Sequence, residues 1–235
     1  MSVLAEPQTG QEPVYPESDG RPMAENTLQF EWIVTIEGGL DALFREVPDV
    51  FVAGDLLWYP VEGSPTIRAA PDALVVFGRP KGHRGSYLQW REDGIAPQVV
   101  FEVLSPGNRL PEFVNKFHFY EQYGVEEFYV YDPQRGELAG WLRRGHSGLE
   151  TIEEMQGWVS PRLQVRFELQ GKDLRLSGPD GRAFLNYVEL ARERDEASRQ
   201  RDEASRQYEA ERRKSEILEA RLRELGVDPE SGGDR

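Results

Sequence analysis

Apolar residues recur at helical spacing in two stretches of the chain. One face of residues 26–46 carries a large apolar residue at nearly every turn, from Leu28 to Phe44. Residues 111–123 repeat the pattern with aromatic side chains, and Pro111 suits the first turn of a helix. The spacing predicts two amphipathic helices, each of which buries one face.

Short apolar runs bounded by Gly, Pro and Asp lie between and after these helices, and such runs are typical of β-strands. The predicted strands cover residues 49–55, 56–59, 70–77, 97–104, 126–132, 137–143, 148–155, 162–169 and 173–177. Helix–strand–strand order followed by strand–helix–strand order predicts the α/β class (mixed α+β), with a mixed sheet flanked by helices.

The C-terminal part has a different pattern. Residues 194–200 read RDEASRQ and residues 201–207 repeat the same letters, which gives the coiled-coil period. We expect a long charged helix over 184–226, whose seam is poor in apolar residues until a last cluster of Leu218, Leu222 and Leu225. Two interpretations stay open. The helix is either solvated and held by i,i+4 charge pairs, or it is a coiled coil for self-association or a protein partner.

These patterns divide the chain into four parts. Residues 1–25 are rich in breakers and acids and lack periodicity, which predicts a disordered N-terminal extension. Residues 26–183 form the predicted globular domain, and residues 184–226 form the long helix or coiled coil. Residues 227–235 are expected to be a disordered tail.

Two of the apolar strands each contain one carboxylate. Asp72 follows Pro71 at the start of one run, and Glu102 has three apolar residues before it and two after it. A charge inside a buried strand is costly unless it is paired or bound to a metal. An acid after proline is often only a turn residue, so Glu102 is the stronger signal. Lys116, on the helix that follows, adds a cation that could either act in a site or extend to solvent.

These stretches resemble the Uma-type restriction endonuclease family, which belongs to the PD-(D/E)XK nuclease superfamily. The matching letters are APDALVVFG, PQVVFEVLSPGNR and NKFHFYEQYGVEEFYVYDP. The resemblance implies a restriction-endonuclease-like fold and metal-dependent endonuclease activity. It also implies that Asp72 is the acid of the PD motif, that Glu102 is the second acid, and that Lys116 is the catalytic lysine.

The sequence departs from the superfamily pattern in one place and from the family pattern in another. Leu104 stands where the superfamily usually has a lysine two residues after the second acid. The family takes this lysine from the following helix, which corresponds to Lys116. Glu112 stands four residues before it, where the family often has Asp.

Composition narrows the choice of metal. The chain has no cysteine and three histidines, which leaves an all-oxygen site for Mg²⁺, with Mn²⁺ as the alternative. Asp72, Glu102 and the main-chain carbonyl of Val103 would hold the ion against a phosphodiester, while Lys116 orients or deprotonates the attacking water or stabilises charge. Glu37 is either a surface acid of the first helix or an extra metal-site acid, as in some nucleases of the superfamily.

The charge of the chain affects which binding partner we expect. The net charge of −14 disfavours nucleic-acid binding, because such proteins normally show a basic footprint. A loop between the two acidic strands could contact phosphates or simply be solvated; its basic residues are Arg79, Lys81, His83, Arg84 and Arg91. We expect nucleic acid, DNA in preference to RNA, as the partner. The alternative function is a catalytically silent nuclease-fold binding module, or a scaffold that acts through its coiled-coil tail.

Hydropathy bears on location. No stretch approaches the length of a membrane-spanning helix, and the N-terminus lacks a basic region followed by an apolar core. We therefore expect a cytoplasmic protein that does not associate with membranes.

Overall fold

The computed structural model describes residues 13–20, 22–145 and 148–225. The chain divides into two compact units, Met1–Asn186 and Tyr187–Arg235. Within the described residues, the first unit contains all the strands and two of the α-helices, and the second contains one long helix. Within the described residues, no helix is long and apolar enough to cross a membrane.

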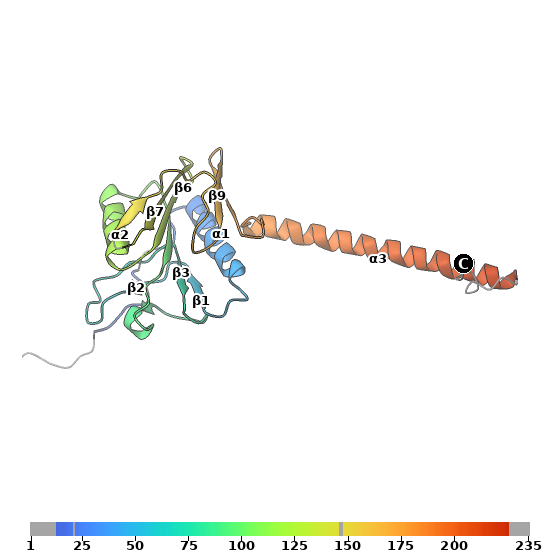
Figure 1. The fold of residues 1–235 in the computed structure, drawn as a ribbon, viewed down its shortest axis with the longest axis horizontal. Helices are drawn as coiled ribbons and strands as arrows, with labels where there is room; N and C mark the ends of the chain where they lie inside the picture. Colours follow the sequence, from blue (N-terminus) through green and yellow to red (C-terminus); the bar gives the residue numbers. More distant parts are fainter. Residues whose placement is uncertain (1–12, 21, 146–147, 226–235) are drawn as a thin grey trace, which may run out of the picture. The chain divides into compact units, whose positions relative to one another are not determined.

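A six-stranded sheet forms the centre of the first unit (Figure 1). Its strands, in spatial order, are β1 (Val50–Ala53), β3 (Ala73–Phe77), β5 (Val99–Val103), β6 (Glu127–Asp132), β7 (Glu137–Arg143) and β8 (Leu149–Thr151). Only β5 and β6 run parallel, and the other neighbours are antiparallel. The predicted mixed sheet flanked by helices is confirmed.

Helices and small sheets cover the two faces of this sheet. One face packs on α1 (Thr27–Leu43) and on the hairpin of β9 (Arg166–Gln170) and β10 (Asp173–Ser177). The other face packs on α2 (Leu110–Gln122) and on the two-stranded pair of β2 (Trp58–Tyr59) and β4 (Tyr87–Leu88). A short 3₁₀-helix, Gln89–Arg91, follows β4. Each face therefore has its own hydrophobic core.

Local signals set the ends of the two helices. The Asn26 side chain accepts a hydrogen bond from the Gln29 N–H at 2.8 Å and caps the start of α1. Pro111 lies in the first turn of α2, where its missing N–H costs nothing. Beyond α2, Gly124 has a φ of +97°, a conformation that glycine adopts readily. The chain can thus turn directly from α2 into β6, and the crossover places α2 over β5.

The segment before α1 differs from the expected disordered extension where it is described. The ring of Tyr15 lies 5.2 Å from that of Tyr59, whose hydroxyl donates to the Pro16 carbonyl at 2.8 Å. The Ser105 hydroxyl donates to the Glu25 carboxylate. These partners lie far along the sequence, so a search for local periodicity cannot detect them. The expectation for residues 1–12 lies outside the described residues.

The second unit contains α3 (Tyr187–Glu224), a single helix that includes both RDEASRQ repeats. None of its residues is buried. Two charge pairs at i,i+4 spacing lie along it, Arg212 with Glu216 at 2.9 Å and Glu219 with Arg223 at 3.8 Å. The contacts agree with the solvated interpretation, while self-association or a protein partner stays a prediction. The predicted helix end at Gly226 and the disordered tail at 227–235 lie outside the described residues.

Removing residues 187–235 is expected to leave a folded domain. Because α3 buries no side chain, its loss should change the unfolding free energy of the domain by no more than about 0.5 kcal/mol. Urea unfolding followed by tryptophan fluorescence of the full chain and of the truncated chain measures this difference. Loss of the cooperative transition in the truncated protein would show that the tail is part of the folding unit.

Candidate active site

The register of the sheet brings the two predicted acids together. Ala73 of β3 pairs with Phe101 of β5, and the two strands are antiparallel. Asp72, directly before Ala73, therefore lies level with Glu102 on the face that packs against α2. Both acids are buried, with 9% of Asp72 and 6% of Glu102 exposed. One Asp72 oxygen accepts the Val103 N–H at 2.6 Å, which fixes its carboxylate beside β5.

Two side chains from α2 hold the Glu102 carboxylate. The Lys116 ammonium lies 2.6 Å from Oε2 of Glu102 and also donates to the Ala70 carbonyl at 3.3 Å. The Tyr120 hydroxyl, one turn further along the helix, donates to Oε1. Tyr120 is fully buried, whereas 35% of the Lys116 side chain is exposed. Each oxygen of Glu102 therefore has a donor and keeps a further lone pair.

Burial and mutual repulsion shape the protonation of this cluster. Burial raises the pKa of Asp72 well above its usual range, and the charge of Glu102 raises it further, against the opposing effects of Lys116 and the Val103 N–H. Burial alone would lower the pKa of Lys116, but the charges of Glu102 and Asp72 outweigh it and raise that pKa. Without a metal, the charged form of Asp72 is therefore disfavoured relative to an ordinary aspartate, whereas the charged form of Lys116 is favoured.

A third acid, which the sequence indicates only as a turn residue, belongs to the surroundings of the site. Asp55 has a φ of +49°, and its N–H donates to the Pro71 carbonyl at 3.1 Å, next to Asp72. Burial raises the pKa of Asp55, and its carboxylate interacts electrostatically with Lys116 and Glu102. The predicted extra acid Glu37 is half-buried near Gly54, and burial followed by repulsion from Asp41 raises its pKa.

The Val103 carbonyl, the third predicted metal ligand, has a hydrogen-bond partner. The Gln29 side-chain amide donates to it at 2.8 Å, and Gln29 is itself buried. A carbonyl has two lone pairs, so this bond orients the oxygen and leaves one acceptor position. Gln29 and Tyr120 thus both support the site. The helical pattern predicts only a packing role for Tyr120 and gives no signal for Gln29.

The basic loop between the two acidic strands is largely neutralised within the domain. Arg79 and Arg84 both contact Glu92, at 2.8 and 2.7 Å, and Lys81 contacts Asp41 at 3.1 Å. The Arg84 guanidinium also lies 3.9 Å from the centre of the Phe51 ring. These contacts give the loop a structural role and do not support the interpretation that it binds phosphates.

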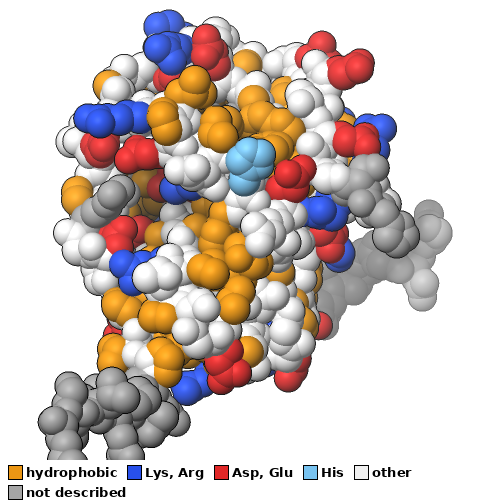
Figure 2. Space-filling view, turned by 90° about the vertical axis from the view of Figure 1, so that its left-hand side faces the viewer, with side chains coloured by type: hydrophobic (Ala, Val, Ile, Leu, Met, Phe, Trp, Pro, Cys, Tyr) orange, Lys and Arg blue, Asp and Glu red, His pale blue; other side chains and the backbone are white. Residues whose placement is uncertain are grey.

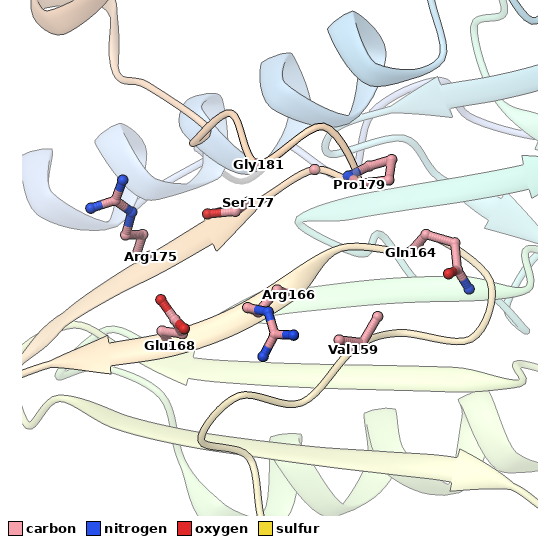
Figure 3. A pocket seen from close by; sticks show the side chains of 9 residues that line it. Val159, Gln164, Arg166, Glu168, Arg175, Ser177, Pro179 and Gly181 are labelled. Atoms are coloured by element: carbon pink, nitrogen blue, oxygen red, sulfur yellow. The ribbon is translucent and has the colours of Figure 1, made fainter.

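Two of the hollows in the described part of the first unit differ in their relation to the candidate site. One, of about 500 Å³, lies on the β9–β10 hairpin, and Arg166, Glu168, Arg175 and Ser177 project from its two strands (Figure 3). None of the acids or cations of the candidate site lines it. The other, of about 570 Å³, lies between α2 and the sheet, next to the candidate site.

Comparisons with known proteins identify the family of the chain. Residues 15–177 match the family Uma2, which is described as "Putative restriction endonuclease". The chain belongs to this family. A comparison with curated proteins found no match. Among solved structures, the chain is similar to the crystal structure of "a putative nuclease belonging to DUF820" from Anabaena variabilis. The two are 14% identical with a TM-score of 0.43, over 64% of this chain and 75% of that one.

The Uma2 match extends the sequence resemblance toward the N-terminus. It begins at Tyr15, which packs on Tyr59, and ends at Ser177, the last residue of β10. The match therefore includes Asp72, Glu102 and Lys116, and it excludes α3. Membership of this family supports a nuclease, and families with a restriction-endonuclease-like fold generally use divalent metal ions.

The raised pKa of Asp72 predicts a pH-dependent stability in the metal-free protein. An acid whose pKa is higher in the folded state stabilises the fold fully below its unfolded pKa, about 4, and this contribution is lost as the pH rises through the folded value. Asp72→Asn cannot ionise. Its unfolding free energy minus that of the wild type should therefore increase between about pH 4 and pH 7.

Urea unfolding in EDTA at a series of pH values, with both proteins in the same buffers, measures this difference. The comparison cancels acids that do not interact with Asp72, such as Glu37 and Glu127, because they are present in both proteins. A difference that does not change with pH would contradict the assigned pKa of Asp72.

Proposed function

We propose that the chain hydrolyses phosphodiester bonds of nucleic acid, with DNA as the expected substrate, in a reaction that needs a divalent metal ion. The observation that carries the proposal is the convergence of three predicted residues from separate elements. The Lys116 ammonium lies 2.6 Å from Glu102, and Asp72 lies level with Glu102 on the neighbouring strand. Two carboxylates and one cation at a shared position suit metal-assisted attack on a phosphate.

The donor set fits Mg²⁺ better than a metal that needs a complete protein cage. Across residues 13–20, 22–145 and 148–225, no group of three or more His, Cys, Asp or Glu could hold a metal ion. The candidate ligands are therefore Asp72, Glu102 and the Val103 carbonyl. Mg²⁺ commonly binds through one or two carboxylates and keeps waters or phosphate oxygens in its other positions. Mn²⁺ accepts the same oxygen ligands.

Each residue of the site has a definable task. Asp72 and Glu102 would hold the metal ion, whose charge would polarise the phosphodiester and lower the pKa of a nearby water. Lys116 would orient or deprotonate the attacking water, or donate to developing negative charge. Tyr120 and Lys116 together fix the orientation of Glu102, and Gln29 fixes the carbonyl of Val103.

Cleavage of supercoiled plasmid DNA by the full chain tests the proposal. We expect nicking with Mg²⁺ or Mn²⁺, no nicking in EDTA, and no nicking by Glu102→Ala. Glu168→Ala is the matched control, because Glu168 lines the hairpin hollow and lies outside the site. Equal nicking by wild type and Glu102→Ala would point to a contaminating nuclease and remove the assignment.

Two observations favour the alternative function. The net charge of −14 and the neutralised basic loop fit a nuclease fold that no longer cleaves and acts as a binding module or scaffold. In that case the wild type would cleave neither DNA nor RNA with either metal. The full chain and Asp72→Asn would then behave alike in every cleavage assay.

A further inference from the structure

The hollow beside α2 has mostly apolar walls with two arginines among them. Its volume of about 570 Å³ is within the range of small-ligand pockets. Most of its lining is apolar: Leu104, Leu110, Phe113, Val130, Leu138, Ala139 and Trp141. Exposed Arg109 and Arg135 line it as well. Hydrophobic side chains also gather on the face of the domain that carries α2 (Figure 2). We call this hollow the α2 groove.

The α2 groove adjoins the candidate site. Val130 of β6 pairs in register with Glu102 of β5, so one wall of the groove begins at the strand position beside the carboxylate. Leu104 follows Glu102 by two residues, which places both side chains on the same face of the sheet. On the opposite wall, Phe113 lies one helical turn before Lys116. A nucleic-acid strand with one phosphate at the two acids would therefore place its neighbouring nucleotide at the groove.

The chemistry of the groove matches one unit of a nucleic-acid strand. Phe113 and Trp141 lie 5.9 Å apart between ring centres and provide aromatic surface on which a base can stack. Arg109 and Arg135 add positive charge in a chain of net charge −14. Two acids also line the groove, Asp132 and Glu137. Asp132 is neutralised in part by Arg135 at 3.4 Å, and it accepts the Gln134 and Arg135 N–H groups.

We propose that the α2 groove binds an unpaired nucleobase of the substrate strand, next to the phosphate held at Asp72 and Glu102. The proposal rests on the nuclease function and specifies its substrate class. A base inside a duplex has both faces stacked and its edge paired, so it must leave the helix before it can enter such a groove. The preferred substrate is then a single strand, or a strand end or flap beside a duplex.

The test uses Asp72→Asn, which keeps the groove and is expected not to cleave. Fluorescence anisotropy compares its binding to a labelled single-stranded oligonucleotide and to a blunt duplex of the same sequence. We expect about tenfold tighter binding of the single strand, a factor within the range that one stacked base supplies. Equal affinity for the two probes, or tighter binding of the duplex, would overturn the proposal.

Second substitutions in the same background locate the binding. Arg109→Gln and Leu110→Gln change exposed groove residues at the start of α2, and Leu110 is 75% exposed, so both should fold. Each should weaken single-strand binding several-fold and leave duplex binding unchanged. Trp141→Leu keeps an apolar side chain but removes the ring, and it should weaken single-strand binding most. Arg175→Gln, in the hairpin hollow of Figure 3, is the matched control and should change nothing.

The outcomes separate this inference from the proposed function. If wild type cleaves DNA but the groove substitutions in the Asp72→Asn background leave binding of both probes unchanged, the groove is not the base site and the nuclease assignment stands. If wild type cleaves nothing while Asp72→Asn still binds single strands through the groove, the binding inference stands and the nuclease assignment falls. If Asp72→Asn binds neither probe, the binding inference falls, and the nuclease assignment falls with it only if wild type also cleaves nothing.

Discussion

The Asp72→Asn variant is expected to lose metal-dependent cleavage and, at the same time, to unfold at a higher urea concentration than the wild type. The amide cannot serve as an anionic metal ligand, and the loss of several kcal/mol of transition-state stabilisation corresponds to about a thousandfold in rate. The side-chain oxygen of the introduced amide can still accept the Val103 N–H, so the local bond persists.

The gain in stability has a physical cause. The wild type holds Asp72 in a buried position beside the charge of Glu102, and both effects raise its pKa. Replacing the carboxyl group by a neutral amide removes this penalty at neutral pH. We expect about 1 kcal/mol of added stability, the size commonly gained when an active site gives up its function. Urea unfolding in EDTA at about pH 7, where an ordinary carboxyl group is ionised, measures it. A variant less stable than the wild type would contradict the assigned repulsion.

Lys116→Met should lose activity as well, but with the opposite effect on stability. Removing a positioned donor to developing charge costs about a hundredfold to a thousandfold in rate. The change also leaves Glu102 and Asp72 without the cation that offsets their repulsion. Because 35% of the lysine side chain is exposed, we expect a loss of about 1–2 kcal/mol, less than for a fully buried pair.

Two controls make this prediction specific. Lys172→Met removes an exposed lysine that donates to the Gln134 carbonyl, and it should change neither rate nor stability by much. Combining Asp72→Asn with Lys116→Met should recover part of the lost stability, because one of the two repelling charges is gone. Cleavage rates and urea midpoints of the wild type and these variants measure the predicted changes in activity and stability. A Lys116→Met variant that cleaves at the wild-type rate would remove Lys116 from the site.

The sequence predicts the elements of the fold well because their signals are local. The apolar spacing of residues 26–46 and 111–123 corresponds to α1 and α2, and the interrupted apolar run around Glu102 corresponds to β5. The resemblance to the Uma-type family is what assigns Lys116 to the acids, because its helical position alone also fits a lysine that extends to solvent. Burial on both faces of a central strand makes such apolar patterns strong.

Glu127 shows what the pattern of an acid in an apolar strand cannot distinguish. Like Glu102, it lies in a buried strand, and it is fully buried. Its oxygens accept bonds from the Ser160 hydroxyl, the Arg162 N–H and the Tyr129 hydroxyl. Glu127 therefore anchors the segment before β9 to the sheet. Two of its donors lie more than thirty residues away, so the sequence alone could not separate this structural acid from a functional one.

The same dependence on distant contacts explains why the sequence does not predict the supporting roles of Gln29 and Tyr120. The bond from Gln29 to Val103 spans 74 residues, and the bond from Tyr120 to Glu102 spans 18. Both depend on the packing of a helix on the sheet, which periodicity predicts only as a face and not as a contact. The sequence indicates Asp55 only as part of a Gly-Asp turn, and its electrostatic coupling to Lys116 follows from where that turn lies in three dimensions.

The length of α3 determines how far from the start of the helix a partner bound near its C-terminal end would lie. Its 38 residues extend for about 57 Å at 1.5 Å per residue. From Tyr187 to the first of the leucines Leu218, Leu222 and Leu225 the helix spans about 45 Å. A partner on these leucines is thus held away from the base of the helix by a distance comparable to more than one turn of duplex DNA. The helix can act as a spacer, and inserting or deleting whole heptads would change its reach by about 10 Å each.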